Sequence, residues 1–218
     1  MTTAARGVAR RGFEGFIKQS LKDVPHNSRV LMVGSGGGIE VWLREALQGK
    51  NAELVRTDID PDRKPDVVDD ITASQFPDES FNAIVIMEVL EHVTQPFAAV
   101  AELHRLLRPG GLLVMSTPFF VPLHDRPHDY FRFTRYGLAL LLSRFEDVKV
   151  VQQNGWSEAL LIAGTRVYKE KTLGALAVSV FVVPLCLLLT PVAMLMDKLT
   201  RTDFLTTTYF TTAVRPRS

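Results

Sequence analysis

The sequence has very little cysteine and almost no excess of charge. Cys186 is the single cysteine among 218 residues, which excludes an internal disulfide and a cysteine-ligated metal cluster. We therefore predict a reducing compartment, the cytoplasm, and no bound metal. Twenty-five Lys and Arg residues against 24 Asp and Glu residues leave a formal net charge of +1. Because this balance gives no general attraction to nucleic acid, we predict no nucleic-acid partner.

The N-terminus lacks the continuous apolar run of a signal peptide. Residues 1–21 are instead basic and rich in Gly and Ala, and we expect a short leading helix within a leader of residues 1–27. Apolar residues make up 46% of the chain, enough for one good core. Residues 28–218 are therefore predicted to form one domain.

Short apolar runs alternate with helical patterns along the chain. Strands are expected over residues 29–33, 52–57, 67–68, 81–87, 112–116, 147–151 and 207–214. Helices are expected over residues 39–49, 94–107 and 134–145. This alternation is typical of an α/β fold with an open, mostly parallel sheet. Pro109, Gly110 and Gly111 are expected to end the helix of residues 94–107 before the next strand begins.

A glycine-rich turn follows the first expected strand, and an acid follows the second. Gly34, Gly36 and Gly38 allow a ligand to lie against the backbone, at the sheet edge where α/β proteins bind ligands. Asp58 stands where a carboxylate accepts hydrogen bonds from ribose hydroxyls. The alternatives are a tight connection for the glycines and a turn residue for Asp58. Glycines and acid alone do not separate a nicotinamide dinucleotide from S-adenosylmethionine (SAM), since both carry an adenosine ribose.

The longer pattern separates the two cofactors. Its matching segments are residues 30–38, Asp58, and residues 68–71, 76–82, 89–93 and 107–111. On these segments the sequence resembles the class I SAM-dependent methyltransferases, in the small-molecule group that includes the ubiquinone-type methylases. The resemblance covers roughly residues 28 to 152. It implies a Rossmann-like, mostly parallel seven-stranded sheet with helices on both faces and an antiparallel last strand. An NAD-dependent oxidoreductase would leave the pattern of residues 76–111 unexplained.

The resemblance also implies where SAM binds. The implied cofactor-binding residues are Gly34, Ser35, Gly36 and Gly38 under the methionine and ribose parts, Asp58 and Ile59 at the ribose, Asp70 and Ile71 at the adenine, and Met87 and Glu88 near the sulfonium. Two positions depart from the family pattern. Met32 stands where the family usually has an acid, and Asn82 where it usually has Asp.

The segment after the fifth expected strand is a candidate for the catalytic base. Methyl transfer to a hydroxyl needs an aligned acceptor and a group that takes its proton. Residues 118–134 contain His124 and His128, two of the five histidines, beside Asp125 and Asp129. We hypothesise that His124 or His128 is the base and that Asp125 or Asp129 sets its tautomer. The alternative is that these residues only hold the loop in place, and His92 is interpreted as a structural histidine.

Residues 173–196 contain no charged side chain, so their length alone would suit a transmembrane helix. A single crossing would, however, separate the last strand from the sheet to which the resemblance assigns it. Pro184 and Pro191 are expected to break the helix into short segments. We hypothesise a proline-broken helical hairpin or in-plane segment in the cytoplasmic leaflet. The alternative is a buried helical pair over the substrate pocket or a homodimer contact.

The sequence therefore predicts SAM-dependent methyl transfer to a small or lipid-linked acceptor that carries a hydroxyl. The expected location is cytoplasmic, with peripheral contact to the membrane. The alternative is a membrane-peripheral protein that binds SAM without turnover.

Overall fold

The computed structural model describes residues 7, 10, 12–35, 38–170 and 172–217. The chain divides into two compact units. The sheet unit consists of residues 13–117, 125–151 and 210–218, and the hairpin unit of residues 1–12, 118–124 and 152–209.

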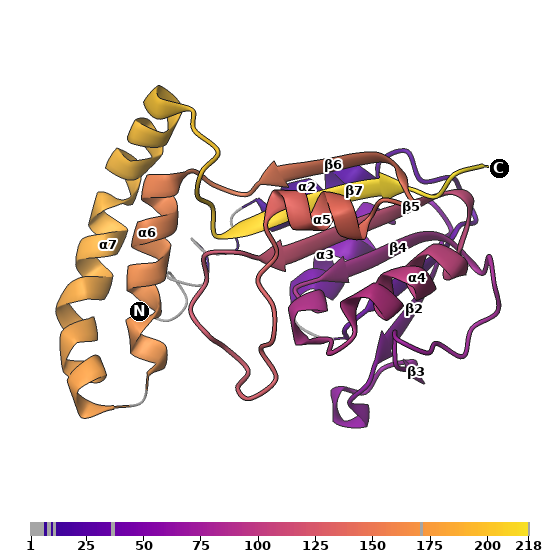
Figure 1. The fold of residues 1–218 in the computed structure, drawn as a ribbon, viewed down its shortest axis with the longest axis horizontal. Coiled ribbons are helices and arrows are strands. Elements are labelled where there is room, and N and C mark those ends of the chain that lie inside the picture. The colour runs from indigo at the N-terminus through magenta and orange to yellow at the C-terminus, as the bar shows by residue number, and fades with distance from the viewer. Residues whose placement is uncertain (1–6, 8–9, 11, 36–37, 171, 218) are drawn as a thin grey trace. The chain divides into compact units, whose positions relative to one another are not determined.

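The described part of the chain forms a seven-stranded sheet with the order β3-β2-β1-β4-β5-β7-β6. The strands are β1 (Arg29–Val33), β2 (Glu53–Asp58), β3 (Val67–Val68), β4 (Phe81–Met87), β5 (Leu107–Pro118), β6 (Glu146–Gln152) and β7 (Thr208–Val214). Strands β1 to β5 pair in parallel. Strand β7 runs antiparallel to its neighbours, as the arrows in Figure 1 show. The predicted mostly parallel sheet with an antiparallel last strand is confirmed.

Helices cover both faces of this sheet (Figure 1). They are α2 (Phe13–Leu21) and α3 (Gly38–Ala46) on one face, and α4 (Pro96–Leu106) and α5 (Arg135–Leu141) on the other. Short 3-10 turns, η1 (Pro61–Arg63) and η2 (Leu90–His92), follow β2 and β4. The α2 side chains Phe13, Ile17 and Leu21 are buried against Val30 and Met32 of β1. Alternate residues of each strand therefore supply the core beneath α2 and α3.

Helix α4 ends at Leu106, so the predicted end of this helix before Pro109, Gly110 and Gly111 is confirmed, while β5 begins earlier than the predicted residue 112. Strand β5 starts directly after α4 and continues through the three residues. They form an irregularity in the pairing with β4, because Gly110 has a φ of 75°. The Gly110 N–H donates to the carbonyl of Arg215, and the Arg215 N–H donates to the carbonyl of Gly111, each at 2.9 Å. Pairing with the residues just after β7 thus satisfies backbone hydrogen bonds of a segment whose proline and glycines suggest a turn.

The hairpin unit contains α6 (Trp156–Thr165), η3 (Arg166–Lys169) and α7 (Leu173–Thr200). Helices α6 and α7 lie side by side (Figure 1). The predicted break at Pro184 and Pro191 is wrong, since α7 is one helix of 28 residues with both prolines inside it. Each proline removes one backbone hydrogen bond, and the other turns keep theirs. The hairpin is therefore made by α7 with α6, not within residues 173–196.

A carboxylate of α7 fastens the hairpin at the start of α6. Asp197 Oδ1 accepts hydrogen bonds from the Ser157 N–H at 3.0 Å and the Ser157 hydroxyl at 2.7 Å. Asp197 Oδ2 accepts one from the Glu158 N–H at 3.1 Å. A negative charge there satisfies free N–H groups at the helix N-terminus and complements the helix dipole. Gly155 is needed for this approach, because a Cβ there would lie 2.3 Å from Asp197 Cγ.

Candidate active site

The glycine turn after β1 requires glycine at its first position. Gly34 has a φ of +85°, and a Cβ on it would lie 2.5 Å from Val89 Cγ2. Its N–H donates to the carbonyl of Thr57 at 2.9 Å, which continues the pairing of β1 with β2. The next residue, Ser35, is buried, and its N–H donates to Asp58 Oδ2 at 2.8 Å. The turn is thus tied to the end of β2.

Asp58 keeps acceptor capacity beyond these bonds. Its Oδ2 accepts from the Ser35 N–H, and its Oδ1 accepts from the Asp60 N–H at 3.0 Å. An ionised carboxylate offers about four acceptor positions. One position on Oδ1 is left for a ligand hydroxyl, and the second position on Oδ2 is met only by the Ser35 hydroxyl at 3.5 Å, a long contact that a ligand hydroxyl can replace. This geometry fits an adenosine ribose. Gly36 lies outside the described residues, Gly38 is the first residue of α3, and Ile59 is exposed.

The other implied cofactor-binding residues follow β3 and β4. Asp70 Oδ1 accepts from the Thr72 N–H at 2.9 Å, and Ile71 is buried. At the end of β4, Met87 is buried and Glu88 has a φ of 55°. The Ser116 hydroxyl of β5 donates to Glu88 Oε1 at 2.9 Å. Since β1 to β4 are parallel, these residues stand at one edge of the sheet, beside the β1–β4 switch point where α/β sheets bind ligands.

The loop of residues 125–134 is attached to η2. His92 Nδ1 lies 2.6 Å from the carbonyl oxygen of His128. A carbonyl only accepts, so His92 carries its proton on Nδ1 and donates it. The Tyr130 N–H donates to the Glu91 carbonyl at 2.9 Å. These contacts support the interpretation of His92 as a structural histidine.

His128 and Asp129 have different partners in this loop. His128 Nδ1 lies 2.8 Å from the Tyr130 hydroxyl. Asp129 Oδ2 accepts from Arg132 at 2.7 Å, and this ion pair raises the pKa of the Arg132 guanidinium. The group that orients the His128 ring in the structure is thus Tyr130, while Asp129 holds Arg132.

Glu91 is a buried carboxyl that the sequence analysis did not single out. Its side chain is fully buried, and burial raises its pKa from 4.5 to about 7. Glu91 Oε1 lies 3.5 Å from His92 Nε2. Because Nδ1 of that ring is the donor to His128, a proton between Nε2 and the carboxyl makes this contact favourable. The pattern around residues 89–93 contained Glu91, but only the fold shows its burial.

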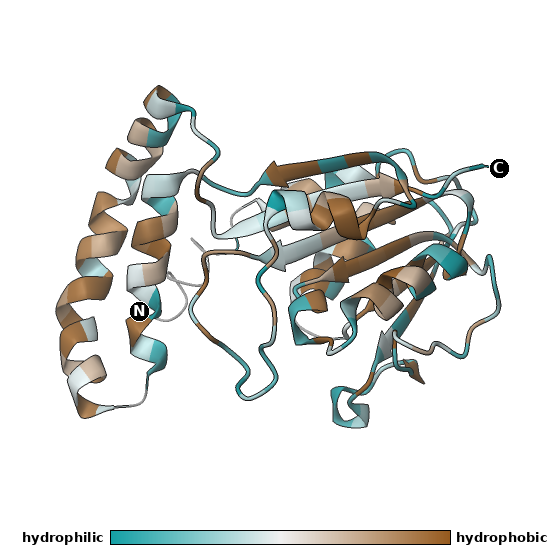
Figure 2. Cartoon of the chain, in the orientation of Figure 1, coloured by the Kyte–Doolittle hydropathy of each residue, from teal (hydrophilic) through white to brown (hydrophobic). Residues whose placement is uncertain are grey.

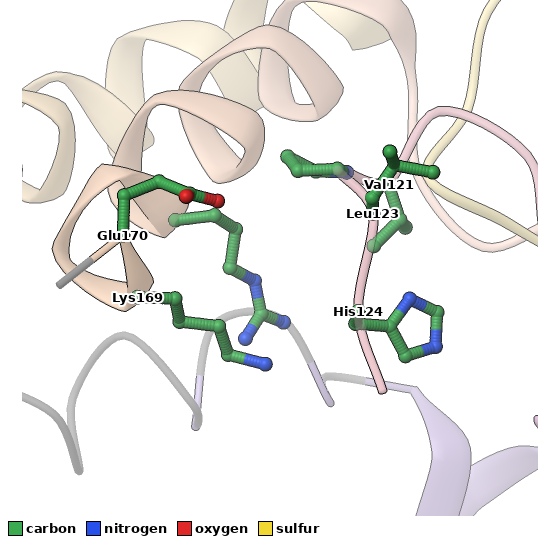
Figure 3. Close-up of a pocket in the computed structure, with 7 residues that line it drawn as sticks. Val121, Leu123, His124, Lys169 and Glu170 are labelled. Atoms are coloured by element: carbon green, nitrogen blue, oxygen red, sulfur yellow. The ribbon is translucent and has the colours of Figure 1, made fainter. Parts of the chain in front are cut away.

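The third proposed catalytic residue, His124, belongs to the hairpin unit. It lines a small hollow whose other lining residues are Val121, Pro122, Leu123, Arg166, Lys169 and Glu170. Figure 3 shows Lys169 reaching from its helix toward the segment that carries Leu123 and His124. His128 and Asp129 instead belong to the sheet unit, as does Asp58.

The two departures from the family pattern have structural partners. Asn82 Oδ1 accepts from the Arg29 N–H at 2.9 Å and from Arg108 at 3.2 Å. An amide oxygen therefore fills the acceptor role at the start of β4. Met32 is buried in the core beneath α2 and α3. Asn82 stands near the start of β4, away from the carboxyl edge that carries Asp58.

The strand order, the glycine turn and its link to Asp58 are features that the chain shares with the class I SAM-dependent methyltransferases. Residues 31–115 match the family model described as a methyltransferase domain. SAM is the cofactor of this class of enzyme.

Curated relatives and solved structures agree with this class. A ubiquinone biosynthesis O-methyltransferase of Xanthomonas oryzae pv. oryzae is 36% identical over 107 residues, covering 41% of this chain and 43% of that protein. The chain thus matches less than half the length of this curated relative. Phosphoethanolamine N-methyltransferase 2 of Haemonchus contortus, solved with S-adenosyl-L-methionine, has a TM-score of 0.61 at 16% identity, covering 94% of this chain and 53% of that one. The cyclase SpnF has a TM-score of 0.60 at 17% identity, covering 94% and 80%. These two structures are similar to the chain in fold.

Proposed function

We propose that this protein transfers a methyl group from SAM to a hydroxyl oxygen of a small or lipid-linked acceptor. The observation that carries the proposal is the Asp58 carboxylate, bonded to Ser35 of the glycine turn and with acceptor positions left for a ribose. The O-methyltransferase relative supports oxygen as the methylated atom. We assign the methyltransferase domain to residues 28–218.

The cofactor-binding residues act by position and charge. Asp58 accepts from the ribose hydroxyls, while Gly34 and Ser35 keep the backbone of the turn close to that carboxylate. Asp70 and Ile71 border the adenine, and the sulfonium end lies near Met87 and Glu88. The described part of this set shares the carboxyl edge of the parallel strands. When bound, SAM supplies a methyl group activated by a positively charged sulfur.

His128 is the base that we favour for the acceptor hydroxyl. Its Nδ1 contacts the Tyr130 hydroxyl, which leaves Nε2 to take the proton as the oxygen forms its bond to the methyl carbon. Asp129 keeps the loop folded through Arg132. His124, with Asp125 beside it, is the alternative base.

Because a lipid-linked acceptor would lie at a membrane, we propose that the protein is cytoplasmic and contacts the membrane peripherally. The apolar helix α7 supports this part of the proposal, since its charge-free stretch is long enough for lipid contact. A homodimer that covers α7 is the competing use of this surface. A SAM-binding protein without turnover is the competing function, and the cyclase SpnF illustrates that one fold carries different reactions.

The test combines binding with turnover. Isothermal titration of the full chain with SAM and, separately, with NAD measures cofactor choice, and we expect binding of SAM only. Transfer of labelled methyl from SAM to membrane and aqueous extracts then finds the acceptor. A labelled lipid product that is stable to mild base, as a methyl ether is and a methyl ester is not, supports the proposal. SAM binding without label in either extract would favour the binding protein, and NAD binding would contradict the cofactor.

A further inference from the structure

Helix α7 exposes large apolar side chains and buries small or hydroxyl-bearing ones, which is the reverse of a helix that packs in a water-soluble protein. Its buried residues, which include the surface against α6, are mostly small or hydroxyl-bearing: Ser179, Val183, Cys186, Thr190 and Ala193. Gly164 of α6 faces this surface, because a Cβ on it would lie 2.9 Å from Cys186 Sγ. The exposed residues are large and apolar: Leu173, Leu176, Val178, Val180, Phe181, Leu185, Leu188, Leu189, Val192, Leu195, Met196 and Leu199.

The exposed apolar surface covers more of α7 than a single stripe. At 100° per residue, these side chains spread over more than half of the helix circumference. Phe181 is 77% exposed, Leu188 74% and Leu199 76%. Figure 2 shows this hydrophobic colouring along most of α7. A helix in water buries such residues and exposes polar ones, and a surface of this size marks an interaction site.

The contact between α6 and α7 is of the kind found between helices in lipid. There, small residues let helices approach closely, and lipid surrounds the large apolar side chains. The polar groups on α7 need no water, because the Ser179 hydroxyl donates to the Leu176 carbonyl at 2.7 Å and the Thr190 hydroxyl to the Cys186 carbonyl at 2.9 Å. Prolines inside helices are also tolerated in membranes.

We propose that the exposed apolar surface of α7 contacts the acyl chains of a bilayer and that the α6–α7 hairpin lies within one leaflet. This inference does not depend on methyl transfer.

The lengths of the two hairpin arms favour a position within one leaflet over a crossing of the bilayer. Helix α7, with 28 residues, is about 42 Å long and would cross the ~30 Å hydrocarbon layer. The return arm is too short, since α6 has 10 residues and η3 has four, against about 20 for a crossing. Both ends of the hairpin join β6 and β7, which are neighbours in one sheet. A crossing would also carry Arg166 and Lys169 through lipid.

Cations at the η3 end of the hairpin favour anionic lipid. Arg166 and Lys169 line the hollow shared with His124, where Glu170 is the one acid among the lining residues. Arg166 Nε is buried and has no hydrogen-bond partner among the described residues. We expect a phosphate group of a lipid headgroup in this hollow to pair with the positive charges of Arg166 and Lys169.

Flotation of the purified full chain with vesicles tests lipid contact. We expect the protein to float with vesicles of equal parts phosphatidylcholine and phosphatidylglycerol. Leu185→Glu combined with Leu188→Glu puts two charges on the exposed surface and should lower the bound fraction roughly tenfold or more. Leu140→Glu, at a position of α5 that is 70% exposed, is the matched control and should float like the wild type.

A second pair of variants tests the headgroup contact. Arg166→Gln with Lys169→Gln should weaken binding to the mixed vesicles by roughly fivefold for each cation, and leave binding to pure phosphatidylcholine unchanged. Arg144→Gln with Lys149→Gln, two exposed cations of the sheet unit, is the control. Inorganic phosphate at millimolar concentration should not compete if the site takes lipid headgroups. Equal loss on both vesicle types would contradict the headgroup contact.

The outcome that overturns the proposal is a wild-type chain that stays unfloated with both vesicle types. If light scattering then shows a dimer that Leu185→Glu with Leu188→Glu dissociates, α7 is a subunit interface. SAM titration of the same variants separates this failure from a failure of the methyltransferase proposal, because cofactor binding should be equal in all of them.

Discussion

Asp58 is the residue on which cofactor binding depends most directly. Asp58→Ala removes charge-assisted hydrogen bonds to the ribose, each worth about 1.5–3 kcal/mol, so SAM affinity should fall on the order of 10- to 100-fold. Isothermal titration measures the change. Asp60→Ala is the control, because Asp60 caps η1 at the same turn, where its carboxylate accepts from the Asp62 N–H and lies 3.8 Å from Arg63 Nε. Equal SAM affinity in the two variants would remove Asp58 from the site.

Substitution of His128 tests whether this residue is the catalytic base or only holds the loop in place. If its Nε2 takes the acceptor proton, His128→Gln should lower kcat by roughly 10²- to 10⁴-fold and leave SAM affinity unchanged. The kcat profile of the wild type should then fall at acid pH, where a protonated ring cannot act as a base, and the variant should lose this limb. Unchanged turnover in His128→Gln would indicate that His124 and not His128 is the base. Reduced stability with an unaltered pH profile would indicate a scaffold.

Glu91 makes stability depend on pH. Burial raises its pKa from 4.5 to about 7 in the folded chain, so the folded state holds a proton that the unfolded state loses first. The resulting stability is complete below pH 4.5 and is lost as the pH rises through about 7. At 1.36 kcal/mol per pH unit between pH 4.5 and about 7, the loss is about 3 kcal/mol.

Glu91→Gln should flatten this dependence. Urea unfolding at pH 5 and pH 8 should show the wild type losing about 2 kcal/mol more than Glu91→Gln over that interval. The exposed Glu53→Gln serves as the control and should follow the wild type. A parallel loss in Glu91→Gln and the wild type would assign the pH dependence to other groups.

At the scale of elements, the strands were the most predictable part of the fold. The predicted bounds of β1 and β4 agree with the structure to the residue. Both are short β-branched and aliphatic runs buried on two faces, which is the strongest local signal for a parallel strand. The early start of β5 and the continuity of α7 were not predicted, because tertiary contacts outweighed the propensities of glycine and proline. Gly110 is paired with the backbone at Arg215, and α7 packs along α6 past Pro184.

The site residues that could be predicted from the sequence are those whose place follows from the order of the strands. Gly34 follows β1 and Asp58 ends β2. Because the parallel pairing of these strands brings their ends together, the proximity of the two residues was expected from the order of the strands alone. The attachment of His92 to His128, 36 residues apart, depends on how the loop folds back onto η2. The burial of Glu91 likewise follows from the loop that covers it, and no local pattern reports it.

The hairpin as an element depends on Asp197. Asp197→Ala leaves the Ser157 and Glu158 N–H groups of α6 without their acceptor, and loss of such a cap costs about 1–2 kcal/mol. Hydrogen exchange at the first turn of α6 should accelerate on the order of tenfold. Lys198→Ala, on the next residue of α7, is the control. Exchange that is unchanged in Asp197→Ala would show that packing alone holds the start of α6.

At the scale of the whole molecule, the topology of the chain restricts how it meets a membrane. The hairpin leaves the sheet after β6 and returns to it at β7, an adjacent strand, so both of its ends belong to one side of a bilayer. With the hairpin in one leaflet, the two ends of α7 stay within reach of the same aqueous phase. The middle of α7 is then out of reach of that aqueous phase.

Cysteine labelling distinguishes this arrangement from a crossing. In a Cys186→Ala background, which removes the native thiol, Leu173→Cys and Leu199→Cys place one thiol at either end of α7. With vesicles present, a membrane-impermeant maleimide added outside should label both ends, because neither end passes the hydrocarbon. Leu185→Cys should react in the absence of vesicles and be protected in their presence. Labelling of Leu199→Cys with protection of Leu173→Cys would mean that α7 crosses the bilayer, since the charged η3 end would then have reached the far side.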